Sequence, residues 1–260
     1  MELEYNMMDL EICVDSVESA AAAESGGAQR VELCSGLMEG GLTPSLGLIR
    51  AVRNRIAIGV HVMIRPRGGD FLYSADEMAV MRDDVAQAAQ VGVAGVVLGL
   101  LTAEGDIDVK RTRDLVELAR PMEVTFHRAI DMTRDVARSL EDVIEAGADR
   151  VLTSGGEPTA LEGSRCIRAL VHSATGRIGL MVGGGVRAEN VQEIAQATGA
   201  REFHASLRST SPSPVIYRVE KVHLGDPGVD DYARTGVWPE DVRMLRKAMD
   251  AALSRNQETR

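Results

Sequence analysis

Short apolar runs alternate with longer amphipathic stretches along most of the chain. The apolar runs predict eight strands, at residues 10–14, 31–33, 58–64, 95–100, 123–127, 150–154, 178–182 and 202–206. The stretches between them predict helices at residues 16–25, 44–53, 76–90, 108–119, 134–146, 159–173 and 188–197, the second with Thr43 as N-cap and Pro44 in its first turn. Short strands alternating with helices of about 10–15 residues are typical of a parallel sheet with crossover helices.

A repeated dipeptide divides this pattern into four similar quarters. Gly27-Ala28, Gly92-Val93, Gly147-Ala148 and Gly199-Ala200 each follow a predicted helix and precede an even-numbered strand. A glycine in the left-handed conformation can end a helix and turn the chain directly into the sheet. Four such quarters with eight strands predict a single-domain (β/α)8 TIM barrel over about residues 8–208. A doubly wound open sheet is the alternative.

The segment after the eighth strand departs from the alternation. Residues 209–236 form a stretch that is too long for a simple connection, with a Ser/Pro-rich part at 210–214 and a turn predicted at 225–228. This stretch predicts either a lid over the barrel mouth or an interface element. A helix is expected from Pro239 to about residue 253, followed by a frayed end, so 209–260 is a C-terminal extension of the barrel.

Composition and charge narrow the class of protein. The length of 260 residues suits one barrel of about 250 residues, and 45% hydrophobic residues suffice for its core. A net charge of −10 argues against nucleic acid or an anionic membrane as partner. No apolar run approaches the length of about 18 residues that a membrane span needs. Three cysteines, an odd number, and an acidic N-terminal stretch favour a reducing compartment, and we expect a cytoplasmic protein.

The predicted barrel interior is unusually polar. Aligning the quarters places Glu32 level with His204, and Cys34 level with Ser154 and Ser206. Because helices cover the outer faces of the strands and exclude water from them, charged side chains are expected to point inward. Period-two alternation then gives an inward set that comprises Glu11, Cys13, Asp15, His61, Met63, Arg65, Thr125, His127, Met181 and Gly183. Barrel interiors are normally filled by branched apolar residues, so this set predicts a functional site.

Several inward residues suit acid/base catalysis. Glu32 could exchange protons with His127 or His61, and Arg65 could orient a substrate. The alternative interpretation is structural, with satisfied core histidines and a buried Glu32–Arg65 ion pair. Cys13 and Cys34 end neighbouring strands on the inward face, so a shared functional role and simple packing are both open interpretations. Two further residues, Cys166 and His172 in a predicted helix, are expected to be ordinary, as is His223 in the C-terminal segment.

Two loops predict an anion site at the barrel mouth. Gly183, Gly184 and Gly185 follow the seventh strand, and Ser206 and Arg208 follow the eighth. Loops after strands 7 and 8 are the recurrent phosphate site of this fold, where backbone N–H groups contact the anion. The loop of residues 65–70, with two arginines, is an alternative anion site.

Six motifs resemble the copper homeostasis protein CutC family. They are Glu11-x-Cys13-Val-Asp-Ser16 and residues 30–45, 61–71, 125–129, 149–155 and 183–187, within a resemblance that covers about residues 10–208. The resemblance implies a cytoplasmic TIM barrel that forms a homodimer or higher homo-oligomer and takes part in copper handling. It also implies Cu(I) binding by cysteines, at positions that correspond to Cys13 and Cys34 here.

Two functional hypotheses therefore stand. The first is a copper-handling protein in which Cys13 and Cys34 bind Cu(I), assisted by Met63 or His61, since soft sulfur ligands suit this ion. The sequence has no Cys-x-x-Cys motif or Met-rich run that would strengthen it. The second is a TIM-barrel enzyme that acts by acid/base chemistry on a small phosphorylated or carboxylated metabolite.

Overall fold

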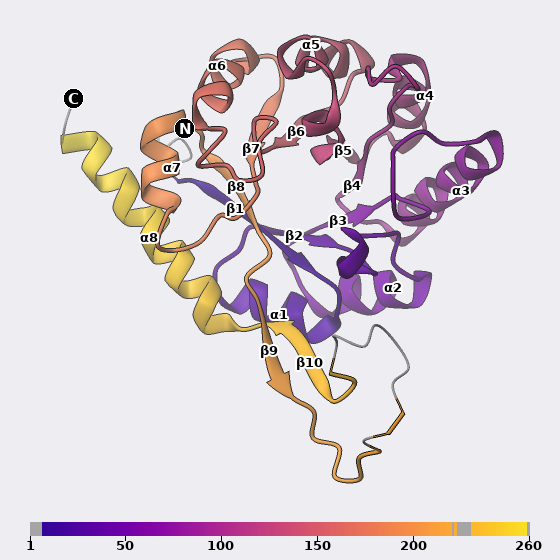
Figure 1. The fold of residues 1–260 in the computed structure, drawn as a ribbon, viewed down its shortest axis with the longest axis vertical. Helices are drawn as coiled ribbons and strands as arrows, with labels where there is room; N and C mark the ends of the chain where they lie inside the picture. Colours follow the sequence, from indigo (N-terminus) through magenta and orange to yellow (C-terminus); the bar gives the residue numbers. More distant parts are fainter. Residues whose placement is uncertain (1–6, 220, 223–229, 259–260) are drawn as a thin grey trace.

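The chain folds into a closed barrel of eight parallel strands surrounded by helices (Figure 1). The structure, a computed structural model, describes residues 7–219, 221–222 and 230–258. The ring closes where β8 pairs with β1, with Glu11 opposite His204. The TIM barrel is thereby confirmed, and the open sheet is excluded. The barrel strands are β1 Asp9–Val14, β2 Arg30–Leu33, β3 Gly59–Met63, β4 Gly95–Leu98, β5 Glu123–Phe126, β6 Arg150–Thr153, β7 Gly179–Val182 and β8 Glu202–Ala205.

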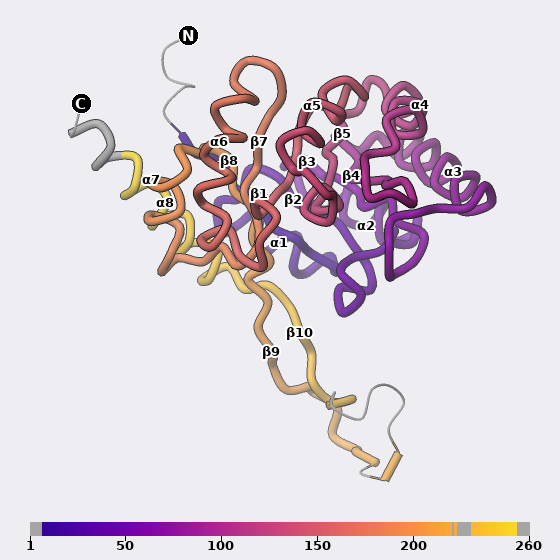
Figure 2. Tube along the Cα trace, turned by 45° about the horizontal axis from the view of Figure 1, so that its top comes forward, coloured from indigo at the N-terminus to yellow at the C-terminus, as the bar shows by residue number. Residues whose placement is uncertain are grey.

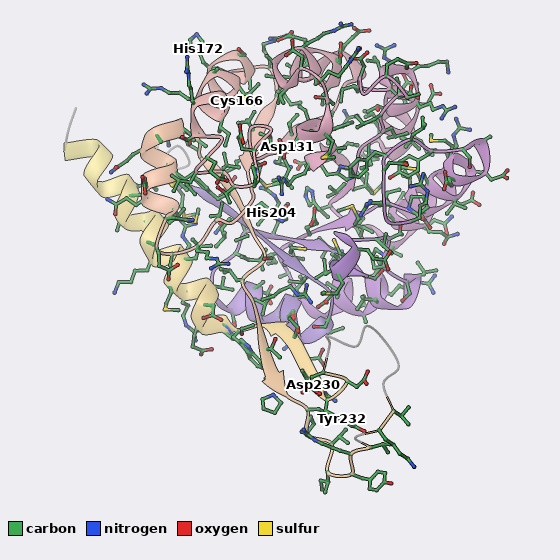
Figure 3. All side chains as sticks on the ribbon, in the orientation of Figure 1. Asp131, Cys166, His172, His204, Asp230 and Tyr232 are labelled. Atoms are coloured by element: carbon green, nitrogen blue, oxygen red, sulfur yellow. The ribbon has the colours of Figure 1, made fainter. Side chains whose placement is uncertain are left out.

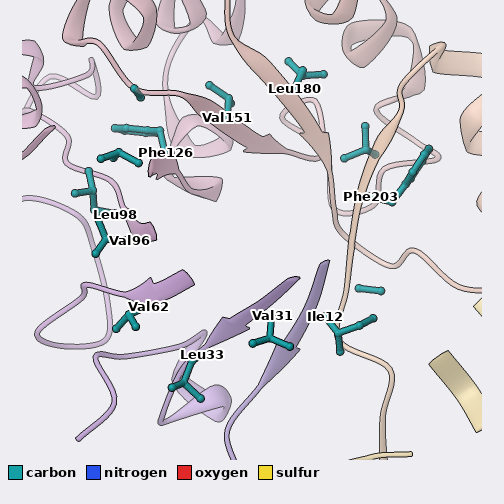
Figure 4. Packing of buried hydrophobic residues seen from close by; sticks show 14 of the residues in the cluster. Ile12, Val31, Leu33, Val62, Val96, Leu98, Phe126, Val151, Leu180 and Phe203 are labelled. Carbon is teal, nitrogen blue, oxygen red and sulfur yellow. The ribbon is translucent and has the colours of Figure 1, made fainter. Parts of the chain in front are cut away.

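The helices cover the outer faces of the strands. They are α1 Val17–Ser25, α2 Leu46–Arg55, α3 Ala75–Val91, α4 Val109–Ala119, α5 Val136–Ala146, α6 Ser164–Ala174 and α7 Val191–Thr198, with short 3-10 helices at Leu37–Glu39 (η2) and Arg128–Met132 (η3). Outward side chains such as Ile12, Val31 and Phe203 are fully buried beneath them (Figure 4). Within the described residues, no helix is both long enough and apolar enough to cross a membrane. The large apolar core therefore lies outside the barrel, and the interior is left for other side chains.

The glycine repeat has the predicted conformation. Gly92, Gly147 and Gly199 cap α3, α5 and α7 with φ values of 77°, 87° and 74°. In the first quarter Gly26 caps α1, and the left-handed residue is Gly27, with a φ of 96°. Each left-handed glycine turns the chain directly into the next even-numbered strand.

Helix α2 begins later than the sequence predicts. Ser45, rather than Thr43, is its N-cap, and its hydroxyl accepts a hydrogen bond from the N–H of Leu48. The Thr43 hydroxyl instead accepts from the backbone N–H of Arg65, at 2.9 Å. This long-range bond joins the loop after β2 to the end of β3, which local capping preferences could not reveal.

Helices α6 and α7 also begin later than expected, at Ser164 instead of residue 159 and at Val191 instead of residue 188. Before α6, the carboxylate of Glu162 accepts hydrogen bonds from the hydroxyl and N–H of Thr159 and closes a separate turn. Before α7, the side chain of Asn190 accepts from the N–H of Arg187 and stabilises a loop. Both loops lie at the barrel mouth.

The C-terminal segment forms a hairpin and a long helix. Strands β9 Arg208–Pro212 and β10 Ala233–Val237 pair antiparallel, and the described part of the hairpin projects away from the barrel in both views (Figures 1 and 2). The expected Ser/Pro loop at 210–214 is thus partly a strand. The described part of the hairpin does not form a lid over the barrel mouth. Helix α8 Pro239–Glu258 packs beside α1 and α7 and continues beyond the expected end at residue 253, since no proline or glycine follows Pro239. The predicted turn at 225–228 lies outside the described residues, and the homo-oligomer stays a prediction.

Candidate functional site

Two thiols and a carboxyl meet at the carboxyl ends of β1 and β2. The register places Cys13 opposite Glu32, so Cys34, two residues further along, lies beside both. The Sγ atoms of Cys13 and Cys34 are 3.9 Å apart, and Cys34 Sγ lies 3.5 Å from Glu32 Oε2. All three side chains are buried, and the cysteines pack against Met63.

His204 completes this group from β8, the strand that pairs with β1 on the side away from β2. It lies near the centre of the barrel (Figure 3). Its Nδ1 lies 2.7 Å from Glu11 Oε1, and its Nε2 lies 3.8 Å from Glu32 Oε2. Arg30 Nε donates to the other oxygen of Glu11 at 2.8 Å. Ligand atoms of Cys13, Glu32 and His204 all lie within 4.8 Å of one another. Glu11 thus holds the imidazole so that Nε2 faces the thiol and carboxyl groups.

The pKa values of the two thiols are shifted in opposite directions. The hydrogen bond from Cys34 lowers the pKa of Cys13 to about 5, with a further contribution from His204. The same contact, together with burial, raises the pKa of Cys34 well above its usual value. At neutral pH the pair therefore consists of a Cys13 thiolate that accepts a hydrogen bond from a Cys34 thiol.

The pKa values of the neighbouring Glu32 and His204 are also shifted. Burial and the negative charge of Cys13 raise the pKa of Glu32 well above its usual value. Burial alone would lower the pKa of His204, but Glu32, Cys13 and Glu11 outweigh it and hold this pKa well above the usual value. Glu11 is ionised because its bonds to His204 and Arg30 outweigh burial and lower its pKa. The Cys13 thiolate accordingly faces the His204 imidazolium, and the Glu32 carboxyl group beside them ionises less readily than usual.

These acidities predict which cysteine reacts first with a small alkylating reagent. Because the thiolate is the nucleophile, iodoacetamide should modify Cys13 at a rate that is constant above about pH 6 and falls about tenfold per pH unit below pH 5. Peptide mass spectrometry over pH 4–8 measures the rates. Cys13→Ser should remove this reaction and leave the high-pH reaction of Cys166, whose pKa is raised by burial. A Cys13 rate that still climbs between pH 7 and 8 would contradict the thiolate assignment.

A cavity of about 270 Å³ lies above this group, at the mouth of the barrel. Its polar lining comes from five strands or the residues that follow them, and includes Cys13, Glu32, Arg65, His127, His204 and Ser206. Leu37, Met63, Phe71 and Leu152 form its apolar walls. The cavity thus brings together Glu32 and His204 with four members of the predicted inward set, namely Cys13, Met63, Arg65 and His127.

His127 and Arg65 line the cavity in different roles. The Nδ1 of His127 accepts from the N–H of Ala129 at 3.1 Å, and burial lowers the pKa of this histidine to about 3. His127 is therefore neutral and carries its proton on Nε2. Arg65 donates to the carbonyl oxygens of Glu39, Gly41 and Gly69, and so holds the loops after β2 and β3. Within the described part of the chain, Glu32 and Arg65 do not form the ion pair that the structural interpretation expects.

His61 is not part of this cavity. It faces the barrel interior, but its Nε2 lies 3.7 Å from Glu123 Oε2, at the amino-terminal end of β5. Its ring fits there because Gly95 lacks a side chain; a Cβ at Gly95 would lie 2.7 Å from the imidazole. His61 is opposite Glu32 in the register of β2 and β3, but its side chain is directed toward Glu123 and does not line the cavity with Glu32, Arg65 and His127.

A second cavity, of about 640 Å³, adjoins the first between the loops after β7 and β8. Gly184, Gly185, Ser206 and Arg208 line it, as the sequence predicts for an anion site. Gly183 does not, because its N–H donates to the carbonyl of Thr153 within the barrel.

Two residues of the site, Arg128 and Asp131, were not predicted from the sequence. Arg128 lines both cavities, and its Nε lies 2.8 Å from Asp131 Oδ2. The buried Asp131 carboxylate also accepts from the backbone N–H groups of Ser154 and Gly156, and so fixes the loop after β6 (Figure 3). Arg128 follows His127 within the motif at residues 125–129, which could have indicated it, whereas no sequence pattern indicated Asp131.

The sequence model of the CutC family matches residues 8–209. The chain belongs to the CutC family. It is 52% identical over 243 residues to a Chromobacterium violaceum protein described as "family protein CutC", covering 94% of this chain and 98% of that protein. A human protein named "Copper homeostasis protein cutC homolog" is 50% identical over 216 residues, covering 83% of this chain and 79% of the relative. The structure of a CutC protein from Streptococcus agalactiae superposes with a TM-score of 0.72 at 37% identity, covering 76% of this chain and 98% of that one.

The matched range of this CutC chain contains every barrel strand and the group formed by Cys13, Cys34, Glu32 and His204. It ends before β10 and α8, so the C-terminal segment is only partly included. The site therefore lies in the part of the chain that defines the family.

Proposed function

We propose that this CutC protein takes part in copper homeostasis by binding one Cu(I) ion between Cys13 and Cys34, with His204 as a third ligand. The observation that carries the proposal is the pair of buried sulfur atoms 3.9 Å apart, with a ring nitrogen of His204 within 4.8 Å of Cys13 Sγ. Thiolate and imidazole are ligands that suit Cu(I), whereas a carboxylate suits harder ions. The name of the human relative supports a link to copper homeostasis.

The surroundings of the cysteines fit this role. Cys13 is already a thiolate, so only Cys34 and the His204 Nε2 must lose a proton when the metal binds. Glu11 accepts from His204 Nδ1, the arrangement in which a carboxylate orients a metal-binding histidine. The ion would reach the sulfur atoms through the central cavity, which Cys13 lines.

A pair of matched substitutions tests the ligand set. His204→Gln removes the proposed nitrogen ligand and should weaken Cu(I) binding at least tenfold, while Glu32→Gln should change it less than about threefold, since a carboxylate is a poor Cu(I) ligand. A competition titration against a chromogenic Cu(I) chelator under anaerobic conditions gives both affinities and the stoichiometry. X-ray absorption at the copper edge should detect mainly sulfur neighbours in the wild type.

The two variants also separate the ligand set from a general loss of structure. Thermal unfolding of the metal-free variants establishes that both are folded at the titration temperature. The proposal fails if Glu32→Gln weakens binding as strongly as His204→Gln, or if the absorption spectrum contains only nitrogen and oxygen neighbours.

A further inference from the structure

We propose that the two adjoining cavities at the barrel mouth bind a small phosphorylated metabolite. Its phosphoryl group would lie against Arg128, Ser206 and Arg208, and an oxygen atom of its organic part would lie against Arg65 and His127. This is a second ligand, separate from the metal, and the inference does not depend on copper binding.

The two cavities share one wall. Arg128, His204, Ser206 and Arg208 line both of them. Their volumes, about 270 and 640 Å³, leave room for a metabolite that extends from one into the other. Ligand sites are typically concave spaces of about 300–1,000 Å³ with mainly apolar walls and a few converging polar groups. The central cavity fits this description, with its apolar residues between the polar ones.

His127 carries a buried donor without a partner. Its Nδ1 accepts from Ala129, so the proton is on Nε2, and Nε2 has no hydrogen-bond partner in the described part of the chain. The Nδ1–Cε1 edge of the ring faces Gly99, where a Cβ would lie 2.4 Å away. The opposite edge, with Nε2, is therefore the one that can face the cavity. Buried donors are normally paired, and an unpaired one at a cavity indicates a ligand or water.

Two further unpaired atoms belong to residues that line the same cavity. Among the described residues, Arg65 Nε and Glu32 Oε1 also have no partner. Arg65 and His127 each offer an N–H, and the unpaired Glu32 oxygen can accept from a hydroxyl group. Two N–H donors and an unpaired carboxyl oxygen complement a hydroxyl group on the ligand.

The second cavity supplies the cationic part of the site. In the described region, the backbone N–H groups of Gly184, Gly185 and Val186 donate to no other residue, and Arg208 Nε is buried and unpaired. Backbone donors combined with guanidinium groups match the several oxygen atoms of a phosphoryl group better than the two of a carboxylate. Glu189 and Asp241 also line this cavity, so we place the phosphoryl group at the wall shared with the central cavity.

Two probes separate the two halves of the site. Isothermal titration calorimetry should show that glycerol 3-phosphate binds at least tenfold more tightly than inorganic phosphate. The reason is that glycerol 3-phosphate has hydroxyl groups that reach Arg65 and His127, whereas inorganic phosphate does not extend to these residues. Arg208→Gln should weaken both probes at least tenfold. His127→Leu should leave phosphate binding within twofold and reduce the advantage of glycerol 3-phosphate at least fivefold.

The matched control is Arg187→Gln. Arg187 lines the second cavity but not the shared wall, so its replacement should change either affinity by less than twofold. Circular dichroism melting establishes that each variant is folded. Gly184→Asp should also abolish phosphate binding, but a Cβ there would lie 3.0 Å from Ser154 Cβ at a φ of 99°, so the arginine variants are the cleaner test.

Three outcomes overturn the proposal. The first is the absence of binding heat for both probes at 10 mM. The second is equal binding by the folded Arg208→Gln and Arg187→Gln variants, which would place the anion elsewhere. The third is equal affinity for the two probes in the wild type, which would remove the central cavity from the site.

Discussion

Replacing Cys13 and Cys34 together by serine should abolish high-affinity Cu(I) binding, with an affinity loss on the order of a thousandfold or more. A hydroxyl group is a hard, weak donor, whereas a thiolate is the soft ligand that Cu(I) prefers. A thousandfold loss corresponds to about 4 kcal/mol. The 3.9 Å between the sulfur atoms allows both to contact one ion after a small movement, so each single substitution should weaken binding less than the double one does.

The fold should survive this double substitution. Serine is close to cysteine in size, although each buried hydroxyl without a partner costs about 1–3 kcal/mol. The measurement is the same Cu(I) competition titration, with circular dichroism melting as the check on folding. Cys166→Ser is the matched control, because Cys166 lies in α6, away from the barrel interior, and should bind no copper. Wild-type affinity in the folded double variant would refute the copper proposal for this site.

The fold was predictable because its signals are local. Apolar runs, amphipathic stretches and the glycine at the end of each second helix are all properties of neighbouring residues. The start of α2 was not predictable in this way, because the Thr43 hydroxyl bonds to the backbone of Arg65, which is remote in sequence. The direction of the β9–β10 hairpin also depends on long-range packing, namely the contact of β10 with α1.

The candidate site was predictable only in part. The alternation of residues along a strand (their parity) gives the face to which a side chain belongs, but not where in the barrel the end of that side chain lies. Parity placed Cys13, Cys34 and Glu32 correctly on the inward face, where strand register brings them together. It also placed His61 inward, but the side chain of this residue is directed toward Glu123 and away from the mouth. The contact of His204 with Glu11 exists only because β8 closes on β1, which the local pattern cannot specify.

Arg30 connects the site to the base of the barrel, and we expect its loss to have the largest effect on stability. Its guanidinium donates to Glu11 and to Glu202, each at 2.8 Å, and its side chain is buried. Glu11 has no exposed surface, so without Arg30 its charge would be balanced only by His204 among the described residues that contact it. Breaking a buried ion pair by removing one partner typically costs about 3–5 kcal/mol.

Arg30→Met should therefore lower the free energy of unfolding at pH 7 by about 3–5 kcal/mol, measured by urea denaturation of the metal-free protein. Because Arg30 lowers the pKa of Glu11, the contribution is fully present above the pKa of an unfolded glutamate, about 4.3, and is lost as the pH falls further. The difference between wild type and variant should shrink accordingly at pH 3.5. Arg177→Met, which removes an exposed pair with Glu141, is the control and should shift the urea midpoint only slightly. Equal shifts for both variants, or a difference that grows in acid, would mean that the buried Arg30–Glu11 pair does not stabilise the barrel.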